Sequence, residues 1–402
     1  MNGMTTTLDT QALPLGLRQL IGKLGKIAVG TLELTTPEGH QLTFGSGEEP
    51  IADVNLSDWR ALRRVFRNGD IGLAECYRDG LIQTSDIAAL MFLGICNQKA
   101  LEKVIMGNRL LNLGYRIRHL LRHNSRKGSS KNIQAHYDLG NDFYQLWLDP
   151  TMTYSSARFE TGHEGDLVQA QGAKYQHMLD QIEAKPGDSV LEIGCGWGGF
   201  AEYAAGQGIR VHGVTLSKRQ LVYARERISQ AGLEGLASFE LRDYRDLDGQ
   251  YDHIVSIEML EAVGEAYWPV YFDKLRGLLK PGGKVAIQTI IIDDKHFDGY
   301  RKRTDFIQQY IFPGGMLPSQ HVIHELAAQH DFEVGQLEAF GADYAETLRR
   351  WRQGFEDNLS KVRELGFDTA FIRLWRFYLA YCEVGFDEQR IDVVQFQLVQ
   401  KS

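Results

Sequence analysis

The chain has 402 residues, of which 43% are hydrophobic and 24% are charged. This composition is typical of a globular protein with a full core, with room for one large or two medium domains. The formal net charge of -8 argues against nucleic-acid binding. No apolar run is long enough to cross a bilayer, and the first ten residues lack the basic-then-apolar layout of a secretion signal.

The four cysteines are scattered along the chain without the spacing of a metal site or a disulfide framework. They are Cys76, Cys96, Cys195 and Cys382. We therefore expect reduced thiols, a cytoplasmic location and no bound metal. Cys195 is expected to pack inside a glycine turn, because no partner base marks it as a nucleophile.

Residues 15–100 predict a small mixed α/β domain. Apolar and polar residues alternate over 27–34 and again over 40–44, on either side of Pro37-Glu38-Gly39, which is the pattern of a β-hairpin. Helical spacing of apolar residues follows over 58–68 and 85–96.

A basic amphipathic stretch covers residues 101–123. From Lys103 to Lys131 inclusive there are eight Lys or Arg residues and no Asp or Glu. Two interpretations remain open: a helix that lies on an anionic membrane surface, or a helix packed on the core with a solvated basic face. The pattern alone favours the second interpretation.

Residues 124–130 are polar and rich in glycine and serine, which predicts a linker between an N-terminal domain at 1–123 and a second domain at 131–402. The second domain alternates strand and helix patterns, so we expect a doubly wound, mostly parallel sheet of the Rossmann-like α/β class. Its predicted strands are 189–193, 210–214, 237–241, 252–257, 284–290 and 391–399.

The most informative segment is Val190-Leu-Glu-Ile-Gly-Cys-Gly-Trp-Gly-Gly199, in which a buried strand runs into a glycine turn that opens a helix. Glycine lets the backbone turn sharply and approach a ligand. Such a turn alone is compatible with a dinucleotide site or a plain strand-to-helix turn. The pattern Glu-x-Gly-Cys-Gly-x-Gly-Gly resembles motif I of S-adenosylmethionine-dependent methyltransferases.

Further segments extend this resemblance in a defined order. They are 131–142, Met152 to Ala157, Gly213 to Ser217, Asp243 to Asp246, Glu258 to Gly264, Tyr310 to Ser319 and Phe340 to Tyr344. In this order and spacing they resemble the cyclopropane-fatty-acid synthase family, which includes mycolic acid cyclopropane synthases and relatives that add methyl or methylene branches. The resemblance is strong over 131–402 and weak over 15–120, which looks like that family's lipid-binding domain.

The resemblance implies that S-adenosylmethionine lies along the glycine turn at Gly194, Gly196 and Gly198, with Tyr154 and Ser155 closing over its amino-acid end. The remaining implied contacts are Thr215, Leu216, Gln220, Asp243 and Tyr244. Taken singly, Asp243 is also typical of a helix cap and Gln220 of a surface helical residue.

The resemblance also implies the catalytic chemistry. A cis alkene attacks the sulfonium methyl, and a bound bicarbonate then takes a proton from the resulting carbocation. The implied bicarbonate ligands are Glu261, Tyr344, the backbone at Ile290, Ser156 in place of a cysteine, and Gln288 in place of a histidine. Glu261 is equally typical of a helix-start acid, and Tyr344 of a packing residue. Ala262 follows Glu261 where histidine is frequent.

The departures at Ser156 and Gln288 leave two products open, a cyclopropane or a methyl- or methylene-branched fatty acid. The expected substrate is a membrane phospholipid with an unsaturated acyl chain. This substrate favours a peripheral position at the anionic inner membrane surface, with residues 101–123 facing lipid. Aromatic residues in 351–381 are expected to line an acyl tunnel or to form core. The family implies a homodimer.

Two other functional classes are weaker. Motif I alone allows a small-molecule methyltransferase that acts on nitrogen or oxygen. A lipid-binding scaffold with an inactive methyltransferase domain is the non-enzymatic alternative. The intact glycine turn, Glu261 and Tyr344 argue against an inactive domain.

Overall fold

The computed structural model describes residues 15–105, 115, 124, 125, 128, 139–160 and 162–401. It divides into two compact units. Unit 1 contains Met1–Arg118, Thr304–Ile311 and Arg363–Glu388, and unit 2 contains His119–Arg303, Phe312–Val362 and Gln389–Ser402. Two segments that we expected in the second domain therefore cluster with the N-terminal part of the chain.

Unit 1 is a mixed sheet with helices packed on it. Its strands are β1 (Thr31–Thr35), β2 (Gln41–Gly45), β3 (Ile51–Leu56) and β4 (Ile82–Gln83) in the order β2-β1-β3-β4. The predicted hairpin is confirmed, because β1 and β2 pair antiparallel from Thr31 opposite Gly45 to Thr35 opposite Gln41. The helices of this unit are α1 (Leu15–Leu24), α2 (Trp59–Arg78), α3 (Ile87–Cys96), α4 (Gln98–Ile105) and α17 (Thr369–Asp387).

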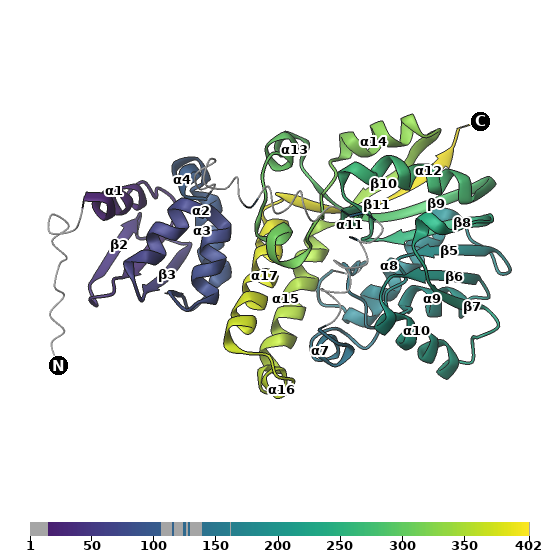
Figure 1. Cartoon of the computed structure of the whole chain (residues 1–402), viewed down its shortest axis with the longest axis horizontal. Coiled ribbons are helices and arrows are strands. Elements are labelled where there is room, and N and C mark those ends of the chain that lie inside the picture. Colours follow the sequence, from purple (N-terminus) through teal and green to yellow (C-terminus); the bar gives the residue numbers. More distant parts are fainter. Residues whose placement is uncertain are drawn as a thin grey trace. The chain divides into compact units, whose positions relative to one another are not determined.

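Unit 2 contains a seven-stranded sheet in the order β10-β11-β9-β8-β5-β6-β7 (Figure 1). Its strands are β5 (Ser189–Ile193), β6 (Arg210–Thr215), β7 (Ala237–Leu241), β8 (Tyr251–Ile257), β9 (Leu279–Ile292), β10 (Phe332–Ala339) and β11 (Ile391–Gln400). Strands β5 to β9 are parallel, whereas β11 pairs antiparallel with β9 and β10 antiparallel with β11. The predicted doubly wound, mostly parallel sheet is confirmed.

Strand β10 is absent from the sequence-based prediction. It is an edge strand in which Glu333 and Gln336 are exposed, and its register with β11 shifts between Val334 and Leu337. A polar edge strand with a bulge has no clear period of two, so its apolar pattern does not predict a strand.

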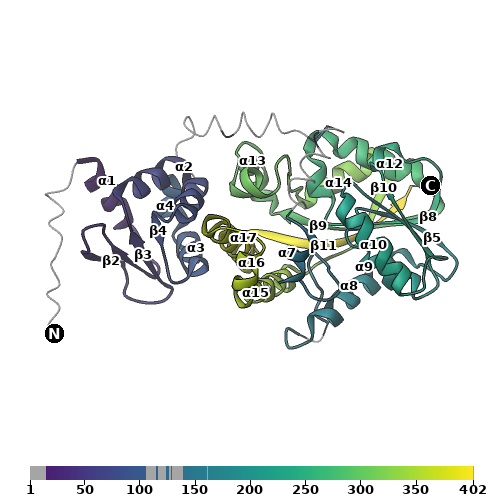
Figure 2. The same ribbon diagram turned by 60° about the horizontal axis from the view of Figure 1, so that its bottom comes forward.

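Helices cover both faces of the sheet. The α-helices of unit 2 before α16 are α7 (Asn141–Gln145), α8 (Leu167–Ile182), α9 (Gly199–Ala205), α10 (Lys218–Gln230), α11 (Leu260–Val263), α12 (Trp268–Leu278), α13 (Asp294–Arg301), α14 (Gln320–Gln329) and α15 (Gly341–Asp357). A short helix α16 (Leu359–Glu364) follows α15. Helices α9 and α10 lie side by side in both ribbon views (Figure 2).

Alternate strand residues enter two separate cores. Val190 and Val255 pack with α8, α9 and α10 on one face of the sheet, while Leu191 and Ile254 pack with α12 and α14 on the other. Successive side chains of a strand point to opposite faces, so a strand buried on both faces must be apolar throughout. This arrangement explains the nearly continuous apolar runs of β5 and β8.

The sheet also defines where a site can form. Strands β6 and β8 flank β5 on opposite sides. The order of the strands therefore reverses at β5: the chain adds β6 and β7 on one side of it and then β8 and β9 on the other. In open α/β sheets, ligands bind beyond the carboxyl ends of the strands at such a switch point. The glycine turn follows β5 at this position, and Glu258 follows β8.

Candidate active site

The glycine turn after β5 has an unusual backbone that leaves space beside it. Gly194, Gly196 and Gly198 have φ values of 86°, 51° and 83°, in the left-handed region that favours glycine. A Cβ on Gly194 would lie 2.5 Å from the Met259 side chain, whereas a Cβ on Gly196 would meet nothing within 4 Å. The turn is therefore open at Gly196, where a ligand can reach the backbone.

The residues predicted to bind the cofactor at the end of β6 form hydrogen bonds with one another. Thr215 Oγ1 donates to Gln220 Oε1 at 2.9 Å, and it accepts from the Ser217 backbone N–H at 3.1 Å. Gln220 is buried in the first turn of α10, so the surface alternative for this residue is wrong. Leu216 is half-buried beside them.

Asp243 and Tyr244 begin a short 3-10 helix after β7. The Asp243 carboxylate accepts from the Arg245 backbone N–H at 3.0 Å and forms an ion pair of 2.6 Å with the Arg245 side chain. The Arg245 guanidinium also lies over the Tyr244 ring, 5.6 Å from its centroid. Asp243 thus does act as a cap, and its carboxylate holds Arg245 in place.

Tyr154 lies in a cluster of aromatic rings, and Ser155 contacts a buried lysine; the sequence predicted neither contact. The Tyr154 ring has its centroid 5.4 Å from those of Tyr144 and Trp351 and 5.5 Å from that of Trp147. The Ser155 hydroxyl accepts a hydrogen bond of 2.7 Å from the Nζ of Lys174. Lys174, on α8, is fully buried and escaped the sequence analysis.

Glu258 is the centre of the predicted catalytic residues, although the sequence analysis assigned it no role. Its Oε1 accepts from the Ser156 backbone N–H and from Gln288 Nε2, both at 2.8 Å. Its Oε2 accepts from the Tyr344 hydroxyl at 2.7 Å. Three residues expected to bind bicarbonate therefore converge on one side-chain carboxylate.

Ser156 takes part through its backbone and not through its side chain. The Ser156 hydroxyl is fully buried and donates to the Ala157 carbonyl at 2.8 Å. In this arrangement the Ser156 hydroxyl is directed to its own loop and not to Glu258, so its implied contact with bicarbonate stays a prediction.

Glu261 lies on α11, three residues after Glu258. One carboxylate oxygen accepts from the Ile290 backbone N–H, and the other, Oε2, is buried without a hydrogen-bond partner among the described residues. Burial and, secondly, the charge of Glu258 raise the pKa of Glu261 to about 8. Glu261 therefore holds its proton near neutral pH, while Glu258 carries the hydrogen bonds that favour an anion.

Lys174 carries the opposite charge to these acids. Burial lowers the pKa of Lys174 to about 7, although the carboxylates of Glu258, Asp149 and Glu192 oppose this shift. Burial likewise raises the pKa of Glu192 well above its ordinary range. Near neutral pH, the site therefore holds acids and an amine whose proton occupancies are sensitive to their neighbours.

Gln288 is held by a polar chain behind it. Its Oε1 accepts from Gln395 Nε2 at 2.8 Å, and the side-chain Oε1 of Gln395 contacts His177 Nδ1. His177 in turn lies 3.4 Å from Glu338. The amide of Gln288 is thereby fixed with its nitrogen toward Glu258.

These contacts do not fit a bicarbonate bound as the resemblance implies. The Ser156 N–H, Gln288 Nε2 and Tyr344 hydroxyl all donate to Glu258, and the Ile290 N–H donates to Glu261. A second anion at this position would have to displace a carboxylate from its donors.

Other expectations lie elsewhere or remain undescribed. The basic stretch 101–123 lies outside the described residues except for 101–105 and 115, and so does most of the 131–142 motif. Of the expected tunnel aromatics, Trp351 and Phe355 are buried in unit 2, while Phe371, Trp375, Phe377 and Tyr378 belong to unit 1.

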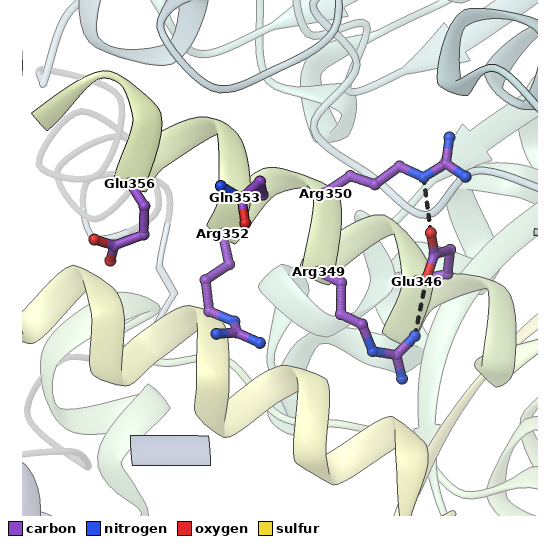
Figure 3. A pocket seen from close by; sticks show the side chains of 6 residues that line it. All are labelled: Glu346, Arg349, Arg350, Arg352, Gln353 and Glu356. Carbon is purple, nitrogen blue, oxygen red and sulfur yellow. Dashed lines mark hydrogen bonds and ion pairs between the residues drawn. The ribbon is translucent and has the colours of Figure 1, made fainter. Parts of the chain in front are cut away.

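A surface hollow on α15 contains none of the predicted site residues. It is lined by Glu346, Arg349, Arg350, Arg352, Gln353 and Glu356 (Figure 3). Arg349 and Arg350 both form ion pairs with Glu346, at 3.0 and 2.8 Å. This hollow is a structured charged face of the helix that also carries Tyr344.

Neither a membrane-spanning helix nor a metal-binding cluster is present among the described residues. No helix among them is long and apolar enough to cross a membrane. No group of three or more His, Cys, Asp or Glu side chains in the same residues is arranged to hold a metal ion.

The sheet order and the glycine turn after β5 define a class I S-adenosylmethionine-dependent methyltransferase. The fold is similar to the structure described as mycolic acid cyclopropane synthase CmaA1 complexed with SAH and CTAB. That match has a TM-score of 0.63 and 32% sequence identity, and it covers 68% of this chain and 98% of the other. The glycine turn, open at Gly196, agrees with a cofactor bound along it.

The chain belongs to the mycolic acid cyclopropane synthetase family, whose model matches residues 124–396. It is 38% identical to the tuberculostearic acid methyltransferase of Mycobacterium tuberculosis, over 84% of this chain and 81% of the relative. It is 34% identical to the cyclopropane-fatty-acyl-phospholipid synthase of Escherichia coli, over 87% and 88%. The protein is an S-adenosylmethionine-dependent methyltransferase of the cyclopropane synthase type.

Proposed function

We propose that this enzyme transfers a one-carbon unit from S-adenosylmethionine to the cis double bond of an unsaturated phospholipid acyl chain. The observation that carries the proposal is the carboxylate of Glu258, held by Ser156, Gln288 and Tyr344 at the carboxyl edge of the sheet. A fixed base at this edge suits a reaction that must remove a proton from a carbocation. The E. coli relative is a cyclopropane-fatty-acyl-phospholipid synthase, which supports the acyl substrate.

The cofactor end of the site consists of residues at or just after the carboxyl ends of β5, β6 and β7, together with two residues from the loop before α8. We assign to it Gly194, Gly196, Gly198, Tyr154 and Ser155, together with Thr215, Leu216, Gln220, Asp243 and Tyr244. When bound, S-adenosylmethionine supplies an electrophilic methyl group. Tyr154 contributes to an aromatic cluster with Tyr144 and Trp351 that excludes water from the reacting centre.

The catalytic end consists of Glu258, Glu261 and the donors around them. Tyr344 and Gln288 orient Glu258, and the Ile290 N–H orients Glu261. Bicarbonate, the base that the family resemblance implies, does not fit beside these occupied donors. Bicarbonate is therefore not assigned as the base in the proposed reaction.

The main product is proposed to be a cyclopropane fatty acid. A methyl- or methylene-branched product is the alternative, and it gains support from the tuberculostearic acid methyltransferase to which this chain is 38% identical. Loss of a proton from the transferred methyl with ring closure gives the cyclopropane, whereas loss from a neighbouring chain carbon gives a methyl-branched alkene. A hydride shift onto the cationic carbon, followed by loss of a methyl proton, gives the methylene branch.

We further propose a peripheral association with the anionic inner membrane surface and a homodimeric assembly. The basic residues between Lys103 and Lys131 support the first point, since a run of cations is attracted to anionic lipid. A cytoplasmic enzyme must reach an acyl chain in the bilayer, and a membrane-facing surface provides that access. The family resemblance is the basis for the homodimer.

The test is incubation of the purified protein with methyl-labelled S-adenosylmethionine and vesicles of cis-unsaturated phospholipid. The released fatty acids are identified by mass spectrometry and proton NMR. High-field cyclopropane methylene signals would establish the main product, and vinylic signals would establish branching. Label that appears only in the phospholipid head group would refute acyl transfer.

A further inference from the structure

One carboxylate lies where the family resemblance expects a dissociable anion. The Ser156 N–H, Gln288 Nε2 and Tyr344 hydroxyl belong to three separate elements, and they donate to Glu258 at 2.8, 2.8 and 2.7 Å. Charge-assisted hydrogen bonds of these lengths are typical of a carboxylate in a preformed anion site. Three of the five implied bicarbonate ligands therefore already have an acceptor, and that acceptor is a side chain of the protein itself.

We propose that Glu258 replaces bicarbonate as the built-in base of this enzyme, so that catalysis requires no added bicarbonate. The inference deepens the proposed function and rests on it. It differs from what the family resemblance implies, since there the base is a bound ion.

The backbone at Glu258 supports this assignment independently. Its φ is 50°, in the left-handed region where a side chain other than glycine is strained. Its backbone N–H donates to the Gln288 carbonyl at 2.8 Å, so the turn is anchored to β9. A strained residue at the end of a strand, with its side chain fully engaged, points to a functional constraint on that side chain.

The electrostatic surroundings suit a base. Burial raises the pKa of Glu258 above its ordinary range, while its hydrogen bonds and the nearby Lys174 oppose that rise. A carboxylate with a raised pKa is a stronger base than one in water. Burial and the charge of Glu258 raise the pKa of Glu261 to about 8, so near neutral pH the neutral form of Glu261 is favoured beside Glu258.

Glu258 can accept the only proton that the reaction releases, so no second base is needed. The alkene π pair forms the carbon–carbon bond to the transferred methyl, and the sulfur–methyl bond breaks with its electron pair left on sulfur. A C–H bond of that methyl then breaks, and its electron pair closes the ring onto the cationic carbon. The proton goes to the Glu258 carboxylate, which becomes the neutral acid.

The first test uses the unmodified enzyme with unsaturated phospholipid vesicles, in carbon-dioxide-free buffer and in buffer with added bicarbonate. We expect the two rates to agree within about 2-fold, since no step consumes bicarbonate. A rate that collapses on depletion and returns with bicarbonate would overturn the role of Glu258. Absence of any acyl product under both conditions would instead refute the proposed function.

The second test uses Glu258→Gln, which keeps the size of the side chain and one acceptor oxygen but lacks a basic carboxylate. We expect its rate to fall by about 100-fold or more, the typical contribution of a positioned base. Retention of the full rate by this variant would show that Glu258 acts only structurally.

The third test compares Glu258→Gly with Glu183→Gly. Glu183 has a φ of 53° and lies exposed at the end of α8, so it offers the same backbone relief away from the site. Both variants are expected to fold, because glycine favours this φ. Only Glu258→Gly should lose activity, and added bicarbonate should restore part of it. Full activity of Glu258→Gly without bicarbonate would overturn the proposal.

Discussion

The Tyr344 hydroxyl donates a 2.7 Å hydrogen bond to Glu258 Oε2 and so joins the first turn of α15 to the end of β8. The two residues are 86 positions apart in the chain. Their contact orients the Glu258 carboxylate from the side opposite to Ser156 and Gln288, because each carboxylate oxygen has its own donors.

Removal of this donor should weaken catalysis while leaving the fold intact. Tyr344→Phe keeps the ring that packs edge-on against Trp351 but loses the hydrogen bond. A hydrogen bond to a charged acceptor contributes about 1.5–3 kcal/mol, so we expect kcat to fall by about 10- to 100-fold. Steady-state kinetics on vesicles measures this effect, with thermal unfolding as the control. An unchanged kcat would mean that Tyr344 only packs.

Glu261 should make the stability of the folded protein decline as the pH rises. Its pKa is raised from 4.5 to about 8, so between these values the folded state binds more protons than the unfolded state. By linkage, the unfolding free energy attributable to this group falls over that window. Glu261→Gln should remove this contribution. Urea unfolding of both proteins at pH 5.5 and pH 8 measures it, and identical pH dependences would contradict the assignment.

Lys174 should have the opposite pH dependence. Its pKa is lowered from 10.5 to about 7, so between these values the unfolded state binds more protons than the folded state. The unfolding free energy attributable to Lys174 therefore rises with pH across that window. Lys174→Met should abolish this rise, measured as the difference between the two unfolding free energies at pH 7 and pH 9. A difference that does not change with pH would argue against a buried, titrating Lys174.

Two glycine substitutions should separate cofactor binding from folding. Gly196→Ala adds a Cβ into open space, and the left-handed φ costs about 1 kcal/mol. We expect this variant to fold but to bind S-adenosylmethionine at least about 10-fold more weakly, since the methyl group fills the space that a ligand would use. Isothermal titration calorimetry measures the affinity.

Gly194→Ala is the matched comparison. Its Cβ would lie 2.5 Å from the Met259 side chain, so the variant should lose stability first, by about 1–3 kcal/mol. Equal affinities for S-adenosylmethionine in Gly196→Ala and the unmodified protein would place the cofactor away from this turn.

Much of the fold is predictable from the chain because its signals are local. The apolar run at Val190 to Ile193 and the glycines after it predict a strand, a turn and a helix without any distant contact. The six predicted strands of the sheet are confirmed for the same reason. Strand β10 is not predictable, since its register with β11 shifts between Val334 and Leu337 and this irregularity breaks the alternation of its apolar residues.

The sequence by itself determined the family, the glycine turn and most of the residues that surround the site, because these depend on residue type and spacing. Only the tertiary structure decided how those residues are used. It directs the donors of Ser156, Gln288 and Tyr344 to Glu258, and it buries Lys174 beside Ser155. The physical reason is that hydrogen-bond partners in a buried site are chosen by geometry between distant segments, and sequence spacing carries no record of that geometry.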